Sequence, residues 1–160
     1  MKSLLILKIC LLTCFASIGQ TISDYEFEWK KNNDCLSEER SIEIFKKVEQ
    51  DPIITEFNKQ QFKNFIQESI QNLNLPKNQN GVLKLKLLFE INQNLCIKEI
   101  GVKELDLSQG QIDQFFKTLS SIDQFKAGKQ RGIEVNCLGI LYINIRNGKV
   151  DKFRIVNFQF

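Results

Sequence analysis

The spacing of hydrophobic residues predicts two amphipathic helices. Between Asn58 and Leu73 the apolar residues recur every three or four positions among Lys, Gln and Glu, and the pattern stops before Pro76. A second stretch repeats this spacing after Ser108, whose hydroxyl suits a helix N-cap. Its apolar positions are Ile112, Phe115, Phe116, Leu119 and Ile122. One face of each helix must therefore be buried against another layer.

Alternation of hydrophobic and polar residues predicts a hairpin between the two helices. The strongest alternation starts after Gly81 and runs from Leu83 to Ile91, with lysines and a glutamate at the intervening positions. Asn92-Gln93-Asn94 follows as a turn, and Ile97 to Val102 returns as the second strand. The segment 82–104 is therefore expected to be a long hairpin.

A second hairpin is predicted at the C-terminal end. After a loop from Asp123 to Gly132, residues 133–145 carry apolar side chains in one phase, and Gly139 interrupts that face as a bulge would. Asn147-Gly148 is the favoured two-residue turn, and 149–158 continues as the last strand. The order helix, strand, strand, helix, strand, strand predicts a two-layer α+β domain with helices on one face of an antiparallel sheet.

The residues before the first helix each fit more than one kind of structure. Tyr25, Phe27 and Trp29 alternate with glutamates, which is typical of a half-buried strand and also compatible with a loose leader. The stretch 37–49 fits a short strand or a turn of helix that ends before Pro52. We therefore divide the chain into an N-terminal extension, 20–43, and a domain, 44–160.

The first 19 residues have the character of a secretory signal peptide. Lys2 precedes an apolar stretch from Leu4 to Ile18, and Ser17 and Gly19 are spaced as at a cleavage site, so we expect cleavage after Gly19. Two alternatives remain: lipidation at Cys14, and a retained anchor, although the apolar stretch is shorter than the roughly 20 residues of a bilayer span. Each alternative exports the remainder of the chain, which predicts a periplasmic or secreted protein.

Charge and cysteine content narrow the function classes. The whole chain has 22 basic and 19 acidic residues, and loss of Lys2 and Lys8 with residues 1–19 would leave 20 against 19. With charges so nearly balanced, we expect no extended basic surface for binding nucleic acid. Three cysteines would remain after export, which allows at most one internal disulfide. They are Cys35, Cys96 and Cys137.

Catalytic and metal chemistry find little support. The chain has no histidine, so the commonest general base and zinc ligand is missing, and we predict no enzyme activity, no metal and no cofactor. The loop 128–132 lacks the spacing of a phosphate-binding loop. The remaining candidates do not form a nucleophile and base pair, and they are Cys35, Glu38, Glu39, Glu99, Glu104 and Asp106.

Several short motifs occur in a recognisable order. Val48-Glu49 and Pro52 precede the first helix, which ends at Leu75-Pro76, and the next strand contains Phe89-Glu90-Ile91. The loop from Phe125 to Gly132 then leads into the strand from Val135 to Ile145. Over about Ile44 to Ile145 this order resembles the C-terminal domain of the TonB energy transducers, in the version common in Bacteroidetes.

The chain departs from that family at defined positions. Residues 53–57 replace the usual Phe-Pro-Gly-Gly turn, Phe125 and Ala127 replace a Trp and a Pro, and Tyr142-Ile143 replaces a Pro-Ile pair. Pro52 and Pro76 are the only prolines, so no proline-rich spacer is visible. We therefore expect a recognition domain without the transducers' membrane anchor and spacer.

The resemblance implies binding by β-augmentation, in which the sheet edge takes up an extended segment of an outer-membrane receptor as an extra strand. Carried onto this chain, the recognising edge is 133–145. The candidate partner-binding residues on it are Glu134, Asn136, Leu138, Ile140, Tyr142 and Asn144. The Asn147-Gly148 turn also permits 149–158 to cap this edge and to become the exposed one.

The sequence therefore predicts an exported protein-interaction module whose partner is a protein or an extended peptide, with a homodimer also open. The alternative is a structural or assembly subunit with a self-capped edge and no transport role. That subunit would bind through Tyr25, Phe27 and Trp29, unless these aromatic residues pack in the core.

Overall fold

A computed structural model of the chain describes residues 24–32, 35, 43–91 and 95–160. The elements in chain order are η1 (Asp24–Glu26), β1 (Glu28–Lys31), β2 (Ile53–Ile54), α1 (Lys59–Asn72), β3 (Gly81–Phe89), β4 (Leu95–Lys103), α2 (Gln109–Leu119), β5 (Phe125–Lys126), β6 (Gly128–Gln130), β7 (Ile133–Val135), β8 (Cys137–Arg146) and β9 (Lys149–Val156). The segments 1–19 and 36–42 and the turn 92–94, on which predictions were made, lie outside the described residues.

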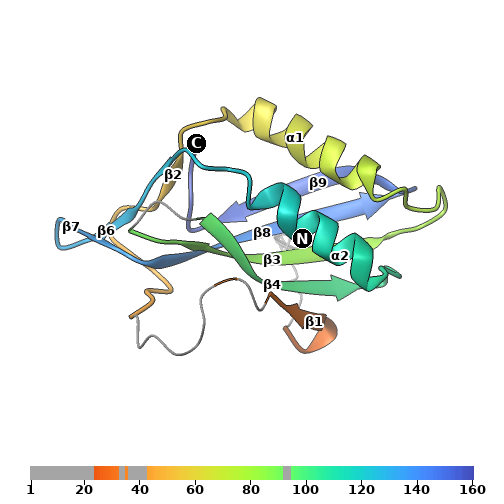
Figure 1. Ribbon diagram of the computed structural model, residues 1–160, viewed down its shortest axis with the longest axis horizontal. Coiled ribbons are helices and arrows are strands. Elements are labelled where there is room, and N and C mark those ends of the chain that lie inside the picture. The colour runs from red at the N-terminus through yellow and green to blue at the C-terminus, as the bar shows by residue number, and fades with distance from the viewer. Residues whose placement is uncertain (1–23, 33–34, 36–42, 92–94) are drawn as a thin grey trace, which may run out of the picture.

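The fold is α+β, as predicted. Five antiparallel strands form the main sheet in the order β1-β4-β3-β8-β9, and α1 and α2 cover one of its faces (Figure 1). Two small two-stranded sheets, β2-β5 and β6-β7, lie beside it. Within the described residues, no helix is both long enough and apolar enough to cross a membrane.

The hydrophobic core lies between the helices and the main sheet. β3 is the central strand, and its residues Leu83 and Leu85 are fully buried against the equally buried Phe62 and Ile66 of α1 and Phe115 of α2. The alternation seen in the sequence therefore places one phase of β3 in the core.

Both predicted helices are confirmed, and each begins with a capping box. The Asn58 side chain accepts hydrogen bonds from the backbone N–H groups of Gln60 and Gln61, at 3.0 and 2.9 Å. Ser108 accepts one from Gln111 at 3.3 Å, and the Gln111 side chain reaches back to the Ser108 N–H at 2.9 Å. These bonds satisfy orphan donors of the first turn, which explains where both helices begin.

The predicted hairpins are largely confirmed. β3 pairs with β4 from Val82 to Phe89, and β8 pairs with β9 across the Asn147-Gly148 turn, whose φ angles of 54° and 68° suit a two-residue hairpin. The predicted single strand 133–145 is two strands, because β7 pairs with β6 instead of the main sheet. Gly139 is regularly paired, so the bulge predicted there is wrong; the irregularity in β8–β9 lies between Asn144 and Ile145.

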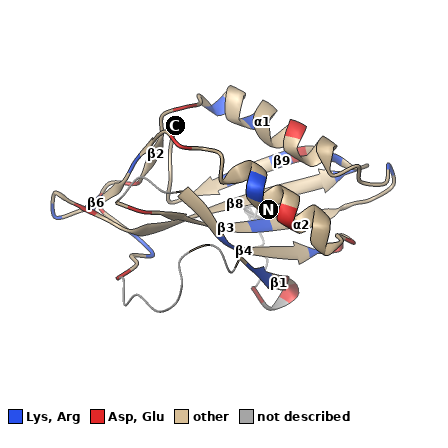
Figure 2. Ribbon diagram, in the orientation of Figure 1, with Lys and Arg blue, Asp and Glu red and all other residues tan. Residues whose placement is uncertain are grey.

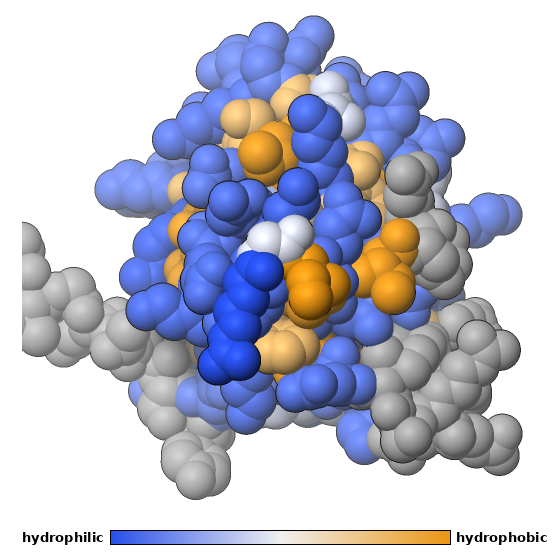
Figure 3. All heavy atoms as spheres, turned by 90° about the vertical axis from the view of Figure 1, so that its left-hand side faces the viewer, coloured by the Kyte–Doolittle hydropathy of each residue, from blue (hydrophilic) through white to orange (hydrophobic). Residues whose placement is uncertain are grey.

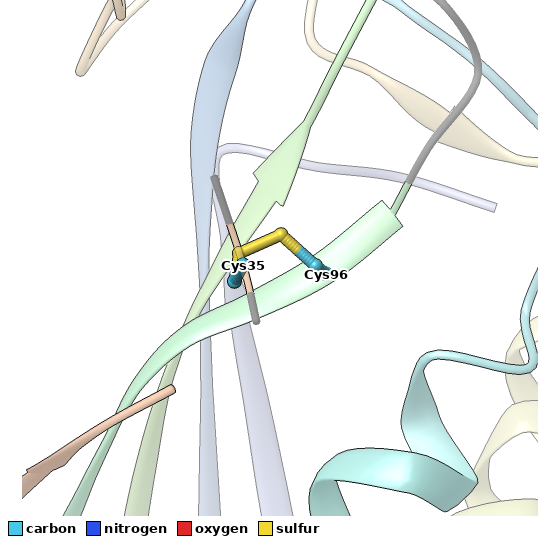
Figure 4. Close-up of a disulfide and its surroundings, with 2 residues drawn as sticks. All are labelled: Cys35 and Cys96. Carbon is cyan, nitrogen blue, oxygen red and sulfur yellow. A yellow bond between two sulfur atoms is a disulfide. The ribbon is translucent and has the colours of Figure 1, made fainter. Parts of the chain in front are cut away.

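The N-terminal segment is part of the sheet. β1 pairs with β4, which places Trp29 opposite Gly101. The strand interpretation of this segment is confirmed for Glu28–Lys31, and η1 precedes it. A disulfide joins Cys35, which follows β1 in the chain, to Cys96 of β4 (Figure 4). Of the three cysteines expected after export, Cys137 is therefore the free one, and it is buried.

Candidate protein-interaction site

Most of the predicted recognition strand is β8, which lies inside the main sheet. β8 pairs with β3 on one side and with β9 on the other, from Ile140 to Arg146. Near Cys137, before the β9 pairing begins, the backbone of Phe45 pairs with the same side of the strand. The Phe45 N–H donates to the Asn136 carbonyl and the Phe45 carbonyl accepts from the Leu138 N–H, both at 2.9 Å. The expected edge is therefore wrong for β8, because the tight Asn147-Gly148 turn folds β9 back onto it. Residues 133–135 form β7, which pairs only with β6 in a separate small sheet.

The six candidate partner-binding residues are separated by this arrangement. Leu138, Ile140, Tyr142 and Asn144 lie on β8 with their backbone groups in the sheet ladder. Glu134 lies on β7 opposite Lys129 of β6. Asn136 lies between the two strands, and its side-chain oxygen accepts a hydrogen bond from the Ile91 N–H at 3.0 Å. Partner binding through these side chains stays a prediction.

β9 is the long open edge of the main sheet. It has eight residues, against four in β1 at the opposite edge. Near its start the Val150 N–H donates to the Gln67 side chain of α1 at 3.2 Å. Beyond its end, Gln159 exchanges backbone hydrogen bonds with Pro52 and Ile54, both at 2.9 Å. Between these points, no other described element pairs with the outer side of residues 151–156. This segment is the accessible sheet edge.

Two shallow hollows follow this edge. One, of about 470 Å³, lies between the start of α1 and residues 151–153 of β9. The other, of about 500 Å³, lies at the β8–β9 turn and reaches Lys77. Asp151 lines both hollows, so they are adjacent along the edge. Phe153 forms an apolar part of the first hollow, where its ring meets that of Phe62 edge-on at 6.2 Å.

Basic side chains dominate the lining of these hollows. Among the described residues that line them, Asp151 is the only acidic one. The basic lining residues, all exposed, are Lys59, Lys63, Lys77, Arg146, Lys149 and Lys152, and we call them the basic rim. Figure 2 shows basic residues on α1 and near β9. Within the described part of the chain, none of the six forms an ion pair with a carboxylate.

At the opposite edge, the side chains of the segment around β1 pack against the sheet. Phe27 is buried and Trp29 is half-buried, with the Trp29 ring 3.9 Å from the Lys86 ammonium. Lys84, on the face away from the helices, is buried beneath this segment and forms an ion pair with Asp24. The packing interpretation therefore holds for these two aromatic residues, while the side chain of Tyr25 lies outside the described ones.

Hydrophobic surface is sparse elsewhere. Figure 3 looks onto the end of the molecule that carries β6 and β7, where a few hydrophobic side chains emerge among hydrophilic ones. The exposed large hydrophobic residues of the described chain are Ile91 and Ile133. Neither lines the basic rim.

Two of the residues weighed for catalysis are engaged in structural contacts. Cys35 is in the disulfide, and the Glu99 carboxylate pairs with Lys86 at 2.7 Å. Glu38 and Glu39 lie outside the described residues. No group of three His, Cys, Asp or Glu residues in the described segments could hold a metal ion. Burial raises the pKa of the Cys137 thiol, which disfavours the reactive thiolate.

The basic rim could not be predicted from the sequence, because its residues are spread from Lys59 to Lys152 and only the fold brings them together. The one local signal is the pair Lys59 and Lys63, spaced four residues apart on the polar face of a helix.

Comparison of the chain with protein-family models, with curated proteins and with solved structures finds no match.

Proposed function

We propose that this chain is an exported protein-interaction module that binds an extended segment of a partner protein as an additional strand along β9. The observation that carries the proposal is the eight-residue edge, paired on its inner side and open on its outer side from 151 to 156. Main-chain hydrogen bonds to such an edge give affinity, and neighbouring side chains give selectivity. β9 takes the role that the sequence assigned to 133–145.

Two further features support an exported partner-binding role. The N-terminal residues have the order of a signal peptide, and a disulfide such as Cys35–Cys96 is typical of proteins in oxidising compartments. The resemblance to the TonB C-terminal domain makes an outer-membrane receptor the first partner to consider. The proposal is a binding role, and two of the residues weighed for catalysis, Cys35 and Glu99, are engaged in structural contacts.

A structural or assembly subunit is the second candidate. The observation that favours it is the closure of β8, by β9 on one part and by the backbone of Phe45 on the other. In that case β9 would be a permanent cap, and a partner would bind at another face.

Site-specific photo-crosslinking in cells, followed by hydrogen exchange, separates the two candidates. A photoreactive amino acid replaces Asp151, which is exposed on β9, or Lys117, which is exposed on α2 and serves as the matched control. Strand addition predicts that the Asp151 position captures one short segment of a partner, and that this segment as a synthetic peptide slows amide exchange in β9. Capture from Lys117 alone, or unchanged exchange in β9 with the captured segment, would favour the assembly role.

A further inference from the structure

The charges around β9 specify the occupant more closely than the open edge alone. We infer that β9 and the basic rim bind an acidic extended peptide, whose backbone pairs with β9 and whose carboxylates meet the rim. This inference rests on the proposed strand addition and adds the chemical class of the partner.

The first argument is local charge imbalance. Six basic residues and one acidic residue line the two hollows, whereas the whole chain is close to balanced, with 22 basic and 19 acidic residues. No rim residue has a carboxylate partner within the described segments. Lys86 on β3 pairs with Glu99, and Lys103 on β4 pairs with Glu26. The rim brings six basic residues that lack such a pair among the described residues together along the open edge.

The second argument is that the arrangement opposes the stability of the free protein. Arg146 and Lys149 are direct cross-strand partners, and like charges in that position repel. Lys59 and Lys63 are four residues apart on α1, which places like charges on neighbouring turns. An acidic occupant would offset these repulsions with attractions of its own to the same residues.

The third argument is shape. An eight-residue strand at about 3.3 Å per residue presents roughly 26 Å of edge. The hollows extend along this edge from the turn, with Arg146 and Lys149, to the start of α1, with Lys59. A small anion would meet only part of the rim, whereas an extended peptide spans it and also satisfies the outer backbone groups of β9.

An unbiased peptide selection tests the inference. A phage-displayed library of random peptides is selected on the full protein, and enriched sequences are synthesised with a fluorophore and measured by anisotropy. Hydrogen exchange of β9 with each peptide reports strand pairing independently of charge. The charge-reversed variant is Lys63→Glu with Lys149→Glu and Lys152→Glu. Its control is Lys117→Glu with Lys126→Glu, which reverses two exposed lysines away from the rim.

We expect enriched peptides that are net acidic and slow exchange in β9. Their affinity should fall roughly tenfold or more in the charge-reversed variant, and by much less in the control, because several exposed charge pairs are lost together. It should also fall between roughly 0.05 and 0.5 M NaCl, where exposed charges are screened. A peptide with its Glu residues changed to Lys should regain binding to the charge-reversed variant.

The experiment distinguishes failure of the acidic specificity from failure of strand addition. Neutral or basic peptides that protect β9 would overturn the acidic specificity and leave strand addition standing. Acidic peptides that bind without protecting β9 would overturn the inference, since the rim would then be a charge patch separate from the edge. Flotation of the protein with phosphatidylglycerol vesicles but not with pure phosphatidylcholine vesicles, together with no enriched peptide, would assign the rim to an anionic membrane surface.

Discussion

Gly139 leaves no room for a side chain in the core. A Cβ atom there would lie 2.7 Å from Cδ1 of Phe158 and 2.8 Å from Cε2 of Phe89, two buried rings. Because the rings are packed against one another at 5.5 Å, neither can move away without disturbing the other. We expect Gly139→Ala to lower the free energy of unfolding by about 1–3 kcal/mol.

Urea denaturation measures this loss, and Gly110 provides the matched control. Gly110 lies in α2, and a Cβ there meets no atom within 4 Å. Gly110→Ala should therefore raise the free energy of unfolding by about 0.5–1 kcal/mol, because alanine favours the helix. Equal effects of the two substitutions would show that the core has room at Gly139.

Lys84 makes the free energy of unfolding depend on pH in the alkaline range. Its burial opposes the charged form, but the hydrogen bond to Asp24 and the nearby Tyr142 raise the pKa of its ammonium above the usual 10.5. A folded-state pKa above the unfolded one adds stability below the unfolded pKa, which is lost as pH rises through the folded pKa. We therefore expect this contribution to be constant at neutral pH and to decline above about 10.5.

Urea denaturation over a pH series tests this expectation, with Lys84→Met as the comparison because other lysines and tyrosines also titrate there. The difference in unfolding free energy between wild type and Lys84→Met should shrink as pH rises past 10.5. Trp29, which lies 5.8 Å from the Lys84 ammonium, provides a fluorescence readout of the same segment. A difference that stays constant with pH would mean that the Asp24 pair does not contribute.

At the scale of elements, the disulfide holds β1 in place. β1 is only four residues long and pairs only with β4, and Cys35 and Cys96 are joined just beyond it. Replacing both cysteines with serine should lower the free energy of unfolding by about 2–4 kcal/mol. Hydrogen exchange should rise at Glu28–Lys31 while β3 stays protected, since β3 keeps both of its neighbours. As a control, a reductant should speed amide exchange at Glu28–Lys31 in the wild type and have no effect on the double variant. If exchange instead rose equally across the whole sheet, the local role of the disulfide would be contradicted.

What could be predicted from the sequence differs between elements. α1, α2 and the two hairpins follow from local signals: the spacing of apolar residues, the caps Asn58 and Ser108, and the Asn147-Gly148 turn. The break between β7 and β8 coincides with a distant contact, the hydrogen bond from the Ile91 N–H to the Asn136 side chain. The neighbours of β8 and the partner of Cys35 are likewise decided by segments far apart in sequence, which periodicity does not report.

At the scale of the molecule, the charge distribution determines how copies of the chain meet. The net charge of +3 is modest, but the basic rim concentrates positive charge on the open edge. Two copies that paired through β9 would bring Lys149 and Lys152 of each into one interface. Like charges across paired strands repel, and lysine on an edge strand is a recognised barrier to self-association.

We therefore expect the protein to be a monomer at low ionic strength, and sedimentation equilibrium over a range of protein concentrations measures this directly. Raising the salt should weaken the repulsion and increase any self-association, whereas it should weaken binding of an acidic peptide. The charge-reversed variant mixed with wild type should associate more strongly at low salt than either protein alone, because their edges are then complementary. A wild-type dimer at low salt with protected β9 amides would show that the natural occupant of the edge is a second copy of the chain.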